Sequence, residues 1–111
     1  MIRVDVDIEG LTYTAKMTGH AYFAEPGQDI VCAAASMLYT ALCQEMIFIS
    51  EDGGGELHKS LENGDYWLVF EGKTWSRDRA DNVVHMFQTG ITLLQSRYPD
   101  YVQYCFHHVM S

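Results

Sequence analysis

The chain has 111 residues, 48% of them hydrophobic and only two of them proline, so its composition indicates one compact domain and excludes a disordered chain. Fifteen acidic residues against seven basic ones give a formal net charge of -8. This charge argues against direct binding to nucleic acid or anionic membranes, because both require lysine and arginine against phosphate. It fits either a basic partner or a solvated acidic surface.

The sequence predicts a cytoplasmic protein. The first residues alternate with charges, which excludes the apolar core of a signal peptide. The longest nearly uncharged run, Ile30 to Gln44, is shorter than the roughly 18 to 20 residues expected of a membrane span. Three cysteines without paired-motif spacing fit reduced thiols better than a disulfide framework.

Two strands open the chain. Residues 2–8 alternate between apolar and charged side chains, which predicts a half-buried strand. Glu9-Gly10 marks a turn, and residues 11–18 alternate again. The two segments therefore predict an antiparallel hairpin that ends at Gly19, followed by a loop over residues 21–28.

A strongly apolar helix is predicted from about Ile30 to Ile47. Asp29 is a good N-cap residue for it, and Cys32 then falls in the first turn. The side chains of this helix are apolar on nearly all sides. We therefore expect most sides of the helix to be buried, in the core or partly in a contact between two copies of the chain.

The second half repeats the order of the first. The run 50–55 predicts a loop, and two strands over 56–62 and 65–71 are joined at Asn63-Gly64, a strong hairpin signal. A helix with one apolar face begins around Asp78 and ends near Tyr98-Pro99, and a final strand covers 102–106. The order β-β-α-β-β-α-β predicts a single α+β domain over residues 1–111, with helices packed on a mixed sheet.

His20 and Cys32 are the candidate catalytic residues. A thiol in the first turn of a helix is stabilised as a thiolate by the free N–H groups and the helix dipole. The end of a strand and the start of the next helix usually lie close together, so the loop can bring the imidazole of His20 to this thiol. The pair then supplies a nucleophile and a general base. A buried structural cysteine and an ordinary loop histidine are the alternatives.

Asp29 and Ser36 are possible supporting residues. Asp29 is favoured as the helix cap, with orientation of His20 as a second role. Ser36 lies one turn beyond Cys32, where it can hydrogen-bond near the site or to the backbone of the preceding turn. The N–H groups of the first helical turn, including that of Cys32, are candidate oxyanion donors.

The remaining cysteines and aromatic residues are assigned structural roles. Cys43 is expected in the core, whereas Cys105 lies on the opposite face of the last strand from its apolar residues. No metal site is expected, because the cluster of Cys105, His107 and His108 lacks the spacing of a zinc site. Trp67 and Phe70 are favoured as strand core, and Trp75 lies in a loop; together with Tyr66 they could instead line a hydrophobic groove.

The segments Gly19-His20-Ala21 and Gly27-Gln28-Asp29-Ile30-Val31-Cys32-Ala33-Ala34-Ala35-Ser36 resemble the bacterial ribosomal-processing cysteine protease family, Prp. The resemblance implies a small homodimeric endopeptidase, without a cofactor, that removes a short N-terminal extension from ribosomal protein twenty-seven of the large subunit. Cys32 would be the nucleophile, His20 the general base and acid, and 21–28 a segment that closes over the peptide.

Two departures concern the loop, where Tyr22-Phe23 stands in place of a smaller residue and Ala24-Glu25-Pro26 is stiffer than a freely closing lid. A different class of function also fits the sequence. In that alternative the chain is a non-enzymatic dimeric domain that binds peptides or takes part in ribosome assembly, and Cys32 is structural.

Overall fold

The computed structural model describes residues 1–19, 26–62 and 64–109. Five strands and two long helices follow in the order expected from the sequence. They are β1 (Ile2–Glu9), β2 (Thr12–Thr18), α1 (Pro26–Glu51), β3 (Gly55–Glu62), β4 (Asp65–Gly72), a short 3-10 turn η1 (Thr74–Ser76), α2 (Arg77–Arg97) and β5 (Val102–Val109).

The strands form one mixed sheet in the order β3-β4-β2-β1-β5. Both predicted hairpins are present as antiparallel pairs, β1 with β2 and β3 with β4, and β4 is also antiparallel to β2. Among the strand pairs of the described residues only β1 and β5 are parallel, because α2 carries the chain back across the sheet before β5. The predicted α+β domain is therefore confirmed.

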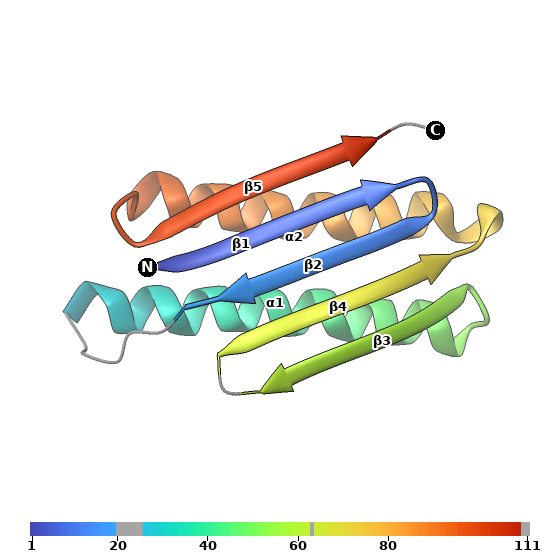
Figure 1. Ribbon diagram of the computed structural model, residues 1–111, viewed down its shortest axis with the longest axis horizontal. Helices are drawn as coiled ribbons and strands as arrows, with labels where there is room; N and C mark the ends of the chain where they lie inside the picture. The colour runs from blue at the N-terminus through green and yellow to red at the C-terminus, as the bar shows by residue number, and fades with distance from the viewer. Residues whose placement is uncertain (20–25, 63, 110–111) are drawn as a thin grey trace.

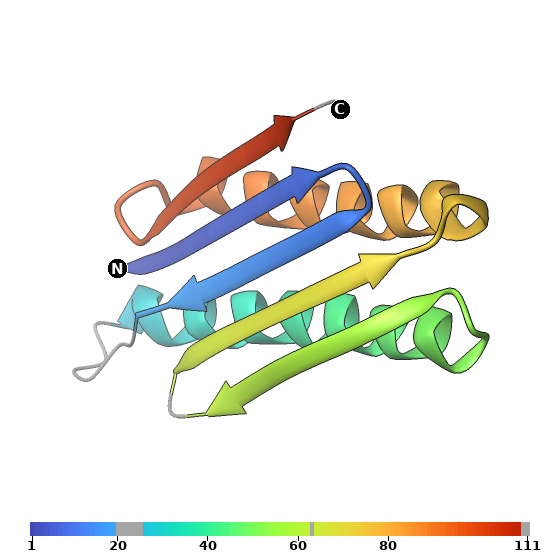
Figure 2. The ribbon, with the colours of Figure 1, turned by 45° about the vertical axis from the view of Figure 1, so that its right-hand side comes forward.

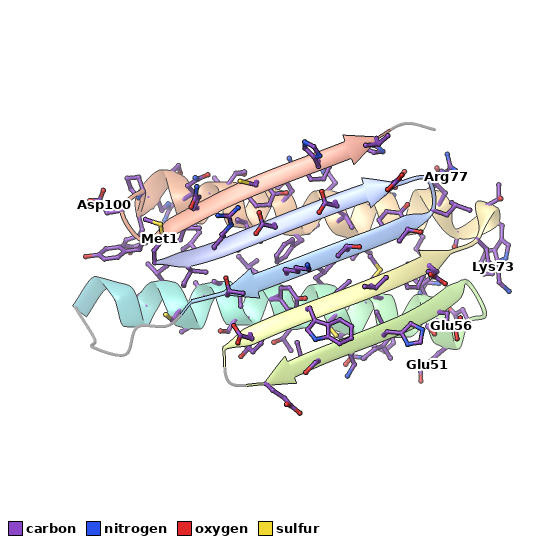
Figure 3. All side chains as sticks on the ribbon, in the orientation of Figure 1. Met1, Glu51, Glu56, Lys73, Arg77 and Asp100 are labelled. Atoms are coloured by element: carbon purple, nitrogen blue, oxygen red, sulfur yellow. The ribbon has the colours of Figure 1, made fainter. Side chains whose placement is uncertain are left out.

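Both helices cover the same face of the sheet, so the domain has two layers (Figures 1 and 2). They run antiparallel: α1 begins at the end of the molecule where β2 finishes, and α2 begins at the opposite end (Figure 1). Figure 3 shows Met1 and Asp100 at the first end, and Glu51, Lys73 and Arg77 at the other. No helix formed by the described residues lies on the second face of the sheet.

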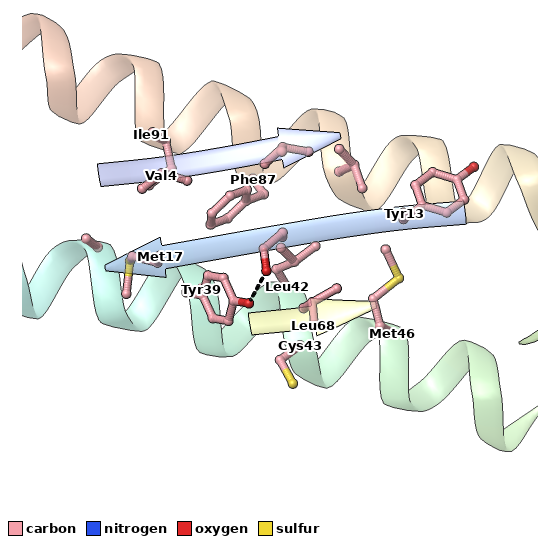
Figure 4. Packing of buried hydrophobic residues seen from close by; sticks show 14 of the residues in the cluster. Val4, Tyr13, Met17, Tyr39, Leu42, Cys43, Met46, Leu68, Phe87 and Ile91 are labelled. Atoms are coloured by element: carbon pink, nitrogen blue, oxygen red, sulfur yellow. Dashed lines mark hydrogen bonds between the residues drawn. The ribbon is translucent and has the colours of Figure 1, made fainter. Parts of the chain in front are cut away.

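The core lies between the sheet and the inner faces of the two helices (Figure 4). Strand alternation turns one side chain in two toward it, such as Val4, Tyr13 and Leu68, which are nearly inaccessible to solvent. Burial of such side chains contributes about 1.5–3 kcal/mol each. The prediction that Cys43 and Phe70 belong to the core is confirmed, since both are buried.

The prediction that Trp67 belongs to the core is wrong. Its side chain is 42% exposed, because the alternation of β4 turns Leu68 and Phe70 toward the helices and Trp67 toward the uncovered face of the sheet. Trp75 lies in η1 and is exposed. Cys105 is exposed as well, opposite the inward-facing side of β5.

The first helix is longer at both ends than the sequence predicted. It begins at Pro26, so residues 26–28 belong to α1 and not to a loop, and it ends at Glu51. Proline is favoured at the first helical position, because its fixed φ is helical and its missing N–H has no partner there anyway. Asp29 is consequently a helical residue and not the N-cap.

The greater length of α1 also corrects the argument about membranes. Residues Ile30–Glu51 are long and apolar enough to span a bilayer by length and composition alone, and a core helix of a folded domain passes the same test. In this fold one face of the helix packs on the sheet through a stripe that includes Val31, Tyr39 and Met46. The opposite face is exposed, so α1 is buried on one side only.

Two hydrogen bonds fix the helices on β2. The hydroxyl of Tyr39 in α1 donates to the carbonyl oxygen of Ala15 at 2.6 Å, drawn as the dashed line in Figure 4. The hydroxyl of Tyr13 in β2 donates to Oδ1 of Asp81 in α2 at 2.5 Å. Burial raises the pKa of both phenols, with the Asp81 carboxylate adding to the shift at Tyr13. Both hydroxyls are therefore held in the donating form.

Candidate active site at the start of the first helix

Cys32 lies on α1, six residues after Pro26, and its side chain is half-buried against the edge of the core. The expectation that it sits in the first helical turn is wrong, because the helix starts earlier than Asp29. Its backbone N–H falls inside the helical hydrogen-bond ladder, where it is not free to bind an oxyanion. The helix dipole is also weaker there, since its effect fades beyond the first turn.

The hydrogen bond between Tyr39 and Ala15 fixes how α1 lies along β2. It therefore shows which part of β2 is level with Cys32. From this bond, Cys32 lies seven residues back along α1, roughly 10 Å at 1.5 Å per residue. Gly19 lies four residues forward along β2, roughly 13 Å at 3.3 Å per residue. Both directions point to the same end of the molecule (Figure 1). The fold thus brings the end of β2 and the cysteine of α1 to similar levels of the two layers.

Gly19 is held in place by Met1. Its φ of +108° lies in the region that favours glycine, and an added Cβ would overlap the carbonyl oxygen of Met1. The backbone at the end of β2 is therefore packed tightly against the start of β1. The sequence marked Gly19 only as the end of a strand, and nothing in the pattern pointed to the close contact with Met1.

Of the other predicted site residues, the structure describes Ser36 fully, Asp29 only in its backbone, and His20 not at all. Ser36 lies one turn after Cys32 and is half-buried, and its carbonyl oxygen accepts a hydrogen bond from Oγ1 of Thr40 at 2.7 Å. Asp29 belongs to the helical backbone of α1. His20 and the loop positions 21–25 lie outside the described residues.

Besides Cys32, metal-ligating side chains and the second cysteine of α1, Cys43, are the other candidates for chemistry. Among the described residues no group of three or more His, Cys, Asp and Glu side chains could hold a metal ion. Cys43 is buried in the core, and burial raises the pKa of its thiol while Lys59 opposes the shift. A thiol held neutral in this way is a poor nucleophile, which leaves Cys32 as the better candidate on α1.

Fold and site together define a small two-layer α+β domain whose candidate nucleophile is a half-buried thiol near the start of its first helix. The chain belongs to the cysteine protease Prp family, whose family model matches residues 1–103. This match covers both His20 and Cys32. The resemblance found in the sequence is thereby confirmed, and with it the class of cysteine proteases.

Solved structures of similar fold support the architecture. SMU.848 from Streptococcus mutans has a TM-score of 0.73 at 24% identity, covering 98% of this chain and 96% of that one. The essential ribosomal processing protease Prp from Staphylococcus aureus, in complex with a substrate peptide, has a TM-score of 0.71 at 20% identity, covering 96% and 99%. The same protease with a covalently linked product peptide gives 0.68 at 21% identity, with the same coverage. No curated protein matches this chain by sequence.

Proposed function

We propose that the chain, over residues 1–111, is a cytoplasmic cysteine endopeptidase that removes a short N-terminal extension from ribosomal protein twenty-seven of the large subunit. The observation that carries the proposal is the position of Cys32. It is a half-buried thiol on α1, at the end of the molecule where β2 finishes at Thr18 and the chain continues through Gly19 to His20. Membership of the Prp family and the likeness to a peptide-bound protease support it.

In the proposed mechanism, His20 takes the proton of the Cys32 thiol, and the thiolate sulfur attacks the peptide carbonyl carbon. The carbon–nitrogen bond then breaks, and the imidazolium of His20 gives its proton to the leaving amine. Water, deprotonated by His20, attacks the thioester. The carbon–sulfur bond breaks, the carboxylate product leaves, and the thiolate or thiol of Cys32 is restored. No cofactor is needed for these steps.

Two supporting roles remain proposals. Asp29 is in the helix and no longer serves as its cap, which leaves orientation of His20 as its proposed role. Ser36 would act from one turn beyond the nucleophile, within the same half-buried stretch of α1. Neither residue is required for the covalent steps, so each is expected to affect the rate less than Cys32 or His20.

The charge of the chain suits this substrate. With a formal net charge of -8, the protein attracts a basic ribosomal protein over a distance and speeds their encounter. We further propose that the protein acts as a homodimer, as the family resemblance implies. A part of the acidic charge lies on the uncovered face of the sheet. Asp5 and Asp7 of β1 and Glu71 of β4 lie there, alternating along their strands with residues that face the helices.

The deciding experiment is an intact-mass assay with a basic ribosomal protein that carries an aromatic-rich N-terminal extension. The native protein is expected to make one defined cut, and Cys32→Ala and His20→Ala are expected to lower the rate by at least about 1000-fold. Cys105→Ser is the matched control, because Cys105 is an exposed cysteine on β5, far along the chain from the site, and its loss should leave the rate unchanged.

Two results would reject the proposal. Binding of the substrate without any cut by the native protein would favour the non-enzymatic peptide-binding domain. An undiminished cut by Cys32→Ala would place the nucleophile elsewhere. Alkylation by iodoacetamide below pH 8 gives an independent measurement: Cys32 should react much faster than the buried Cys43.

A further inference from the structure

The uncovered face of the sheet carries a large share of the acidic charge of the chain. The alternation of the strands and their register place seven of the fifteen acidic residues on this face, against two basic ones, Arg3 and Lys16. The acidic residues are Asp5, Asp7, Glu9, Glu56, Glu62, Asp65 and Glu71. The negative charge of the molecule is therefore concentrated on one face.

Three glutamates lie in one row across the sheet, and Figure 3 shows one of them, Glu56, at the end opposite Met1. The register places Glu71 between Glu56 and Thr12, and Thr12 between Glu71 and Glu9. Neighbouring strands lie about 4.8 Å apart, so Glu56 and Glu71 are like charges in direct opposition. Among the described residues, no lysine or arginine forms an ion pair with this row. Its charge is available to a cation from outside.

A hollow of about 180 Å³ lies beside this row, between β1 and β5. Arg3, Asp5, Asp7 and His107 are part of its lining. Nε of Arg3 donates to Oδ2 of Asp5 at 3.0 Å, so that carboxylate already has a cationic partner. Asp7 is 62% exposed, and its Oδ1 lies 3.9 Å from Nδ1 of His107. The Asp7 carboxylate can therefore receive an ammonium or guanidinium group that enters the hollow.

Trp67 adds an aromatic surface near the middle of the face. It is 42% exposed and lies in register between Ser60 and Lys16. An exposed indole ring attracts a lysine or, more often, an arginine side chain through the cation–π interaction. Carboxylates around an exposed indole are thus complementary to a basic protein surface. The same charge repels the phosphates of nucleic acid and the acidic face of another copy.

The uncovered face begins at the end of the molecule where the proposed active site lies. Thr18, the last residue of β2, pairs with Arg3, and Glu9 lies six residues farther along β1. At 3.3 Å per residue, the row of glutamates is about 20 Å from this end of the sheet. A substrate whose extension enters the site can therefore lay the part that follows the extension on the uncovered face.

We propose that the uncovered face of the sheet is a docking surface for the basic body of the ribosomal protein substrate, the part that follows the cut. Glu9, Glu71 and Asp7 would pair with its lysine and arginine side chains, and Trp67 would pack on a guanidinium group. This inference rests on the proposed function and adds a second contact with the same substrate. The protein would bind the whole precursor more tightly than its isolated extension.

Binding to the Cys32→Ala variant measures docking without cleavage. The two probes are the full-length precursor of ribosomal protein twenty-seven and a synthetic peptide of its N-terminal extension that spans the cut. In this background, Glu9→Gln combined with Glu71→Gln should raise the Kd for the precursor at least about fivefold, because two ion pairs are lost. Trp67→Ala should raise it about threefold. Neither change should alter the Kd for the peptide.

Glu51→Gln combined with Asp78→Asn is the matched control. Both residues are exposed, and their replacement changes the net charge by the same amount, but they lie on the helices and not on the sheet. This variant should bind the precursor within about twofold of the unchanged background. The difference between the two double variants should also disappear near 1 M salt, where charges are screened within about 3 Å. Circular dichroism checks that each variant is folded.

The outcomes separate this inference from the proposed activity. Equal weakening by both double variants would show that the net charge alone attracts the precursor, and would overturn the docking surface. Equal Kd values for the peptide and the whole precursor would overturn it as well. If the precursor binds through Glu9 and Glu71 but the native protein does not cut it, the docking surface stands and the proposed activity fails. A precursor that does not bind at all would overturn both.

Discussion

At the scale of single residues, Gly19 is the position with the least freedom next to the proposed site. Its positive φ excludes most side chains, and the carbonyl of Met1 occupies the space that a Cβ would need. Because His20 follows it directly, any shift of this backbone changes where the chain leaves β2. A glycine that takes no part in proton transfer itself is therefore expected to matter for activity.

We expect Gly19→Ala to lower the free energy of unfolding by roughly 2–4 kcal/mol, from backbone strain together with the overlap at Met1, and to reduce cleavage at least about tenfold. Gly53→Ala separates the two causes. Gly53 also has a positive φ, of 83°, but nothing lies within 4 Å of an added Cβ. Gly53→Ala should lower the free energy of unfolding by only about 1–2 kcal/mol and leave the activity unchanged. Equal losses in urea unfolding would show that the contact with Met1 is unimportant.

Single residues also show where the sequence was insufficient. The alternation of β4 was visible, but the choice of buried face rests on its neighbours in the sheet, so Trp67 was assigned to the wrong side. The predicted start of α1 was wrong because proline is common both in loops and in the first turn of a helix, so Pro26 did not mark the boundary. That choice moved Cys32 from the first turn to the second.

At the scale of elements, the sequence predicted all seven strands and long helices because their patterns are local. Strict alternation marks β1 and β2, and Asn63-Gly64 marks the turn between β3 and β4. The apolar face of α2 was also evident: Val84, Phe87 and Ile91 are all buried. How α1 is placed over β2 is not local, because it depends on a hydrogen bond between Tyr39 and Ala15 that no spacing rule reveals.

Substitutions at Tyr39 of α1 and Tyr104 of β5 test what a buried hydroxyl contributes to stability. The two hydroxyls differ in whether they have a hydrogen-bond partner. The Tyr39 hydroxyl has a buried acceptor, whereas the Tyr104 hydroxyl is buried with no hydrogen-bond partner among the described residues. Tyr39→Phe should lower the free energy of unfolding by about 1–2 kcal/mol. Tyr104→Phe should leave it unchanged or raise it, because it removes an unsatisfied polar group. Urea denaturation of the two variants decides; a larger loss at Tyr104 would contradict this account.

At the scale of the whole molecule, the domain separates its tasks between its ends and its faces. One face of the sheet packs on the helices, and the other is uncovered (Figure 2). The first turns of α1 place Cys32, the proposed nucleophile, toward the end of the molecule where β2 finishes.

The packing of this core also sets its response to alkaline pH. Burial raises the pKa of Cys43, Tyr13 and Tyr39, and raises the pKa of Tyr104 to about 12. In each case the folded state favours the protonated, neutral form. Once the pH exceeds the ordinary values of about 9 for the thiol and 10 for a phenol, the unfolded chain releases protons that the folded chain keeps.

The unfolded state then binds fewer protons, so the free energy of unfolding falls as the pH rises. We expect full stability below pH 9 and a continuous loss from there through pH 12, measured as the urea midpoint at fixed ionic strength. Tyr104→Phe should lose stability less steeply than the native protein between pH 10 and pH 12, because one of the linked groups is gone. A midpoint that stays constant up to pH 11 would show that these side chains are not held neutral by the fold.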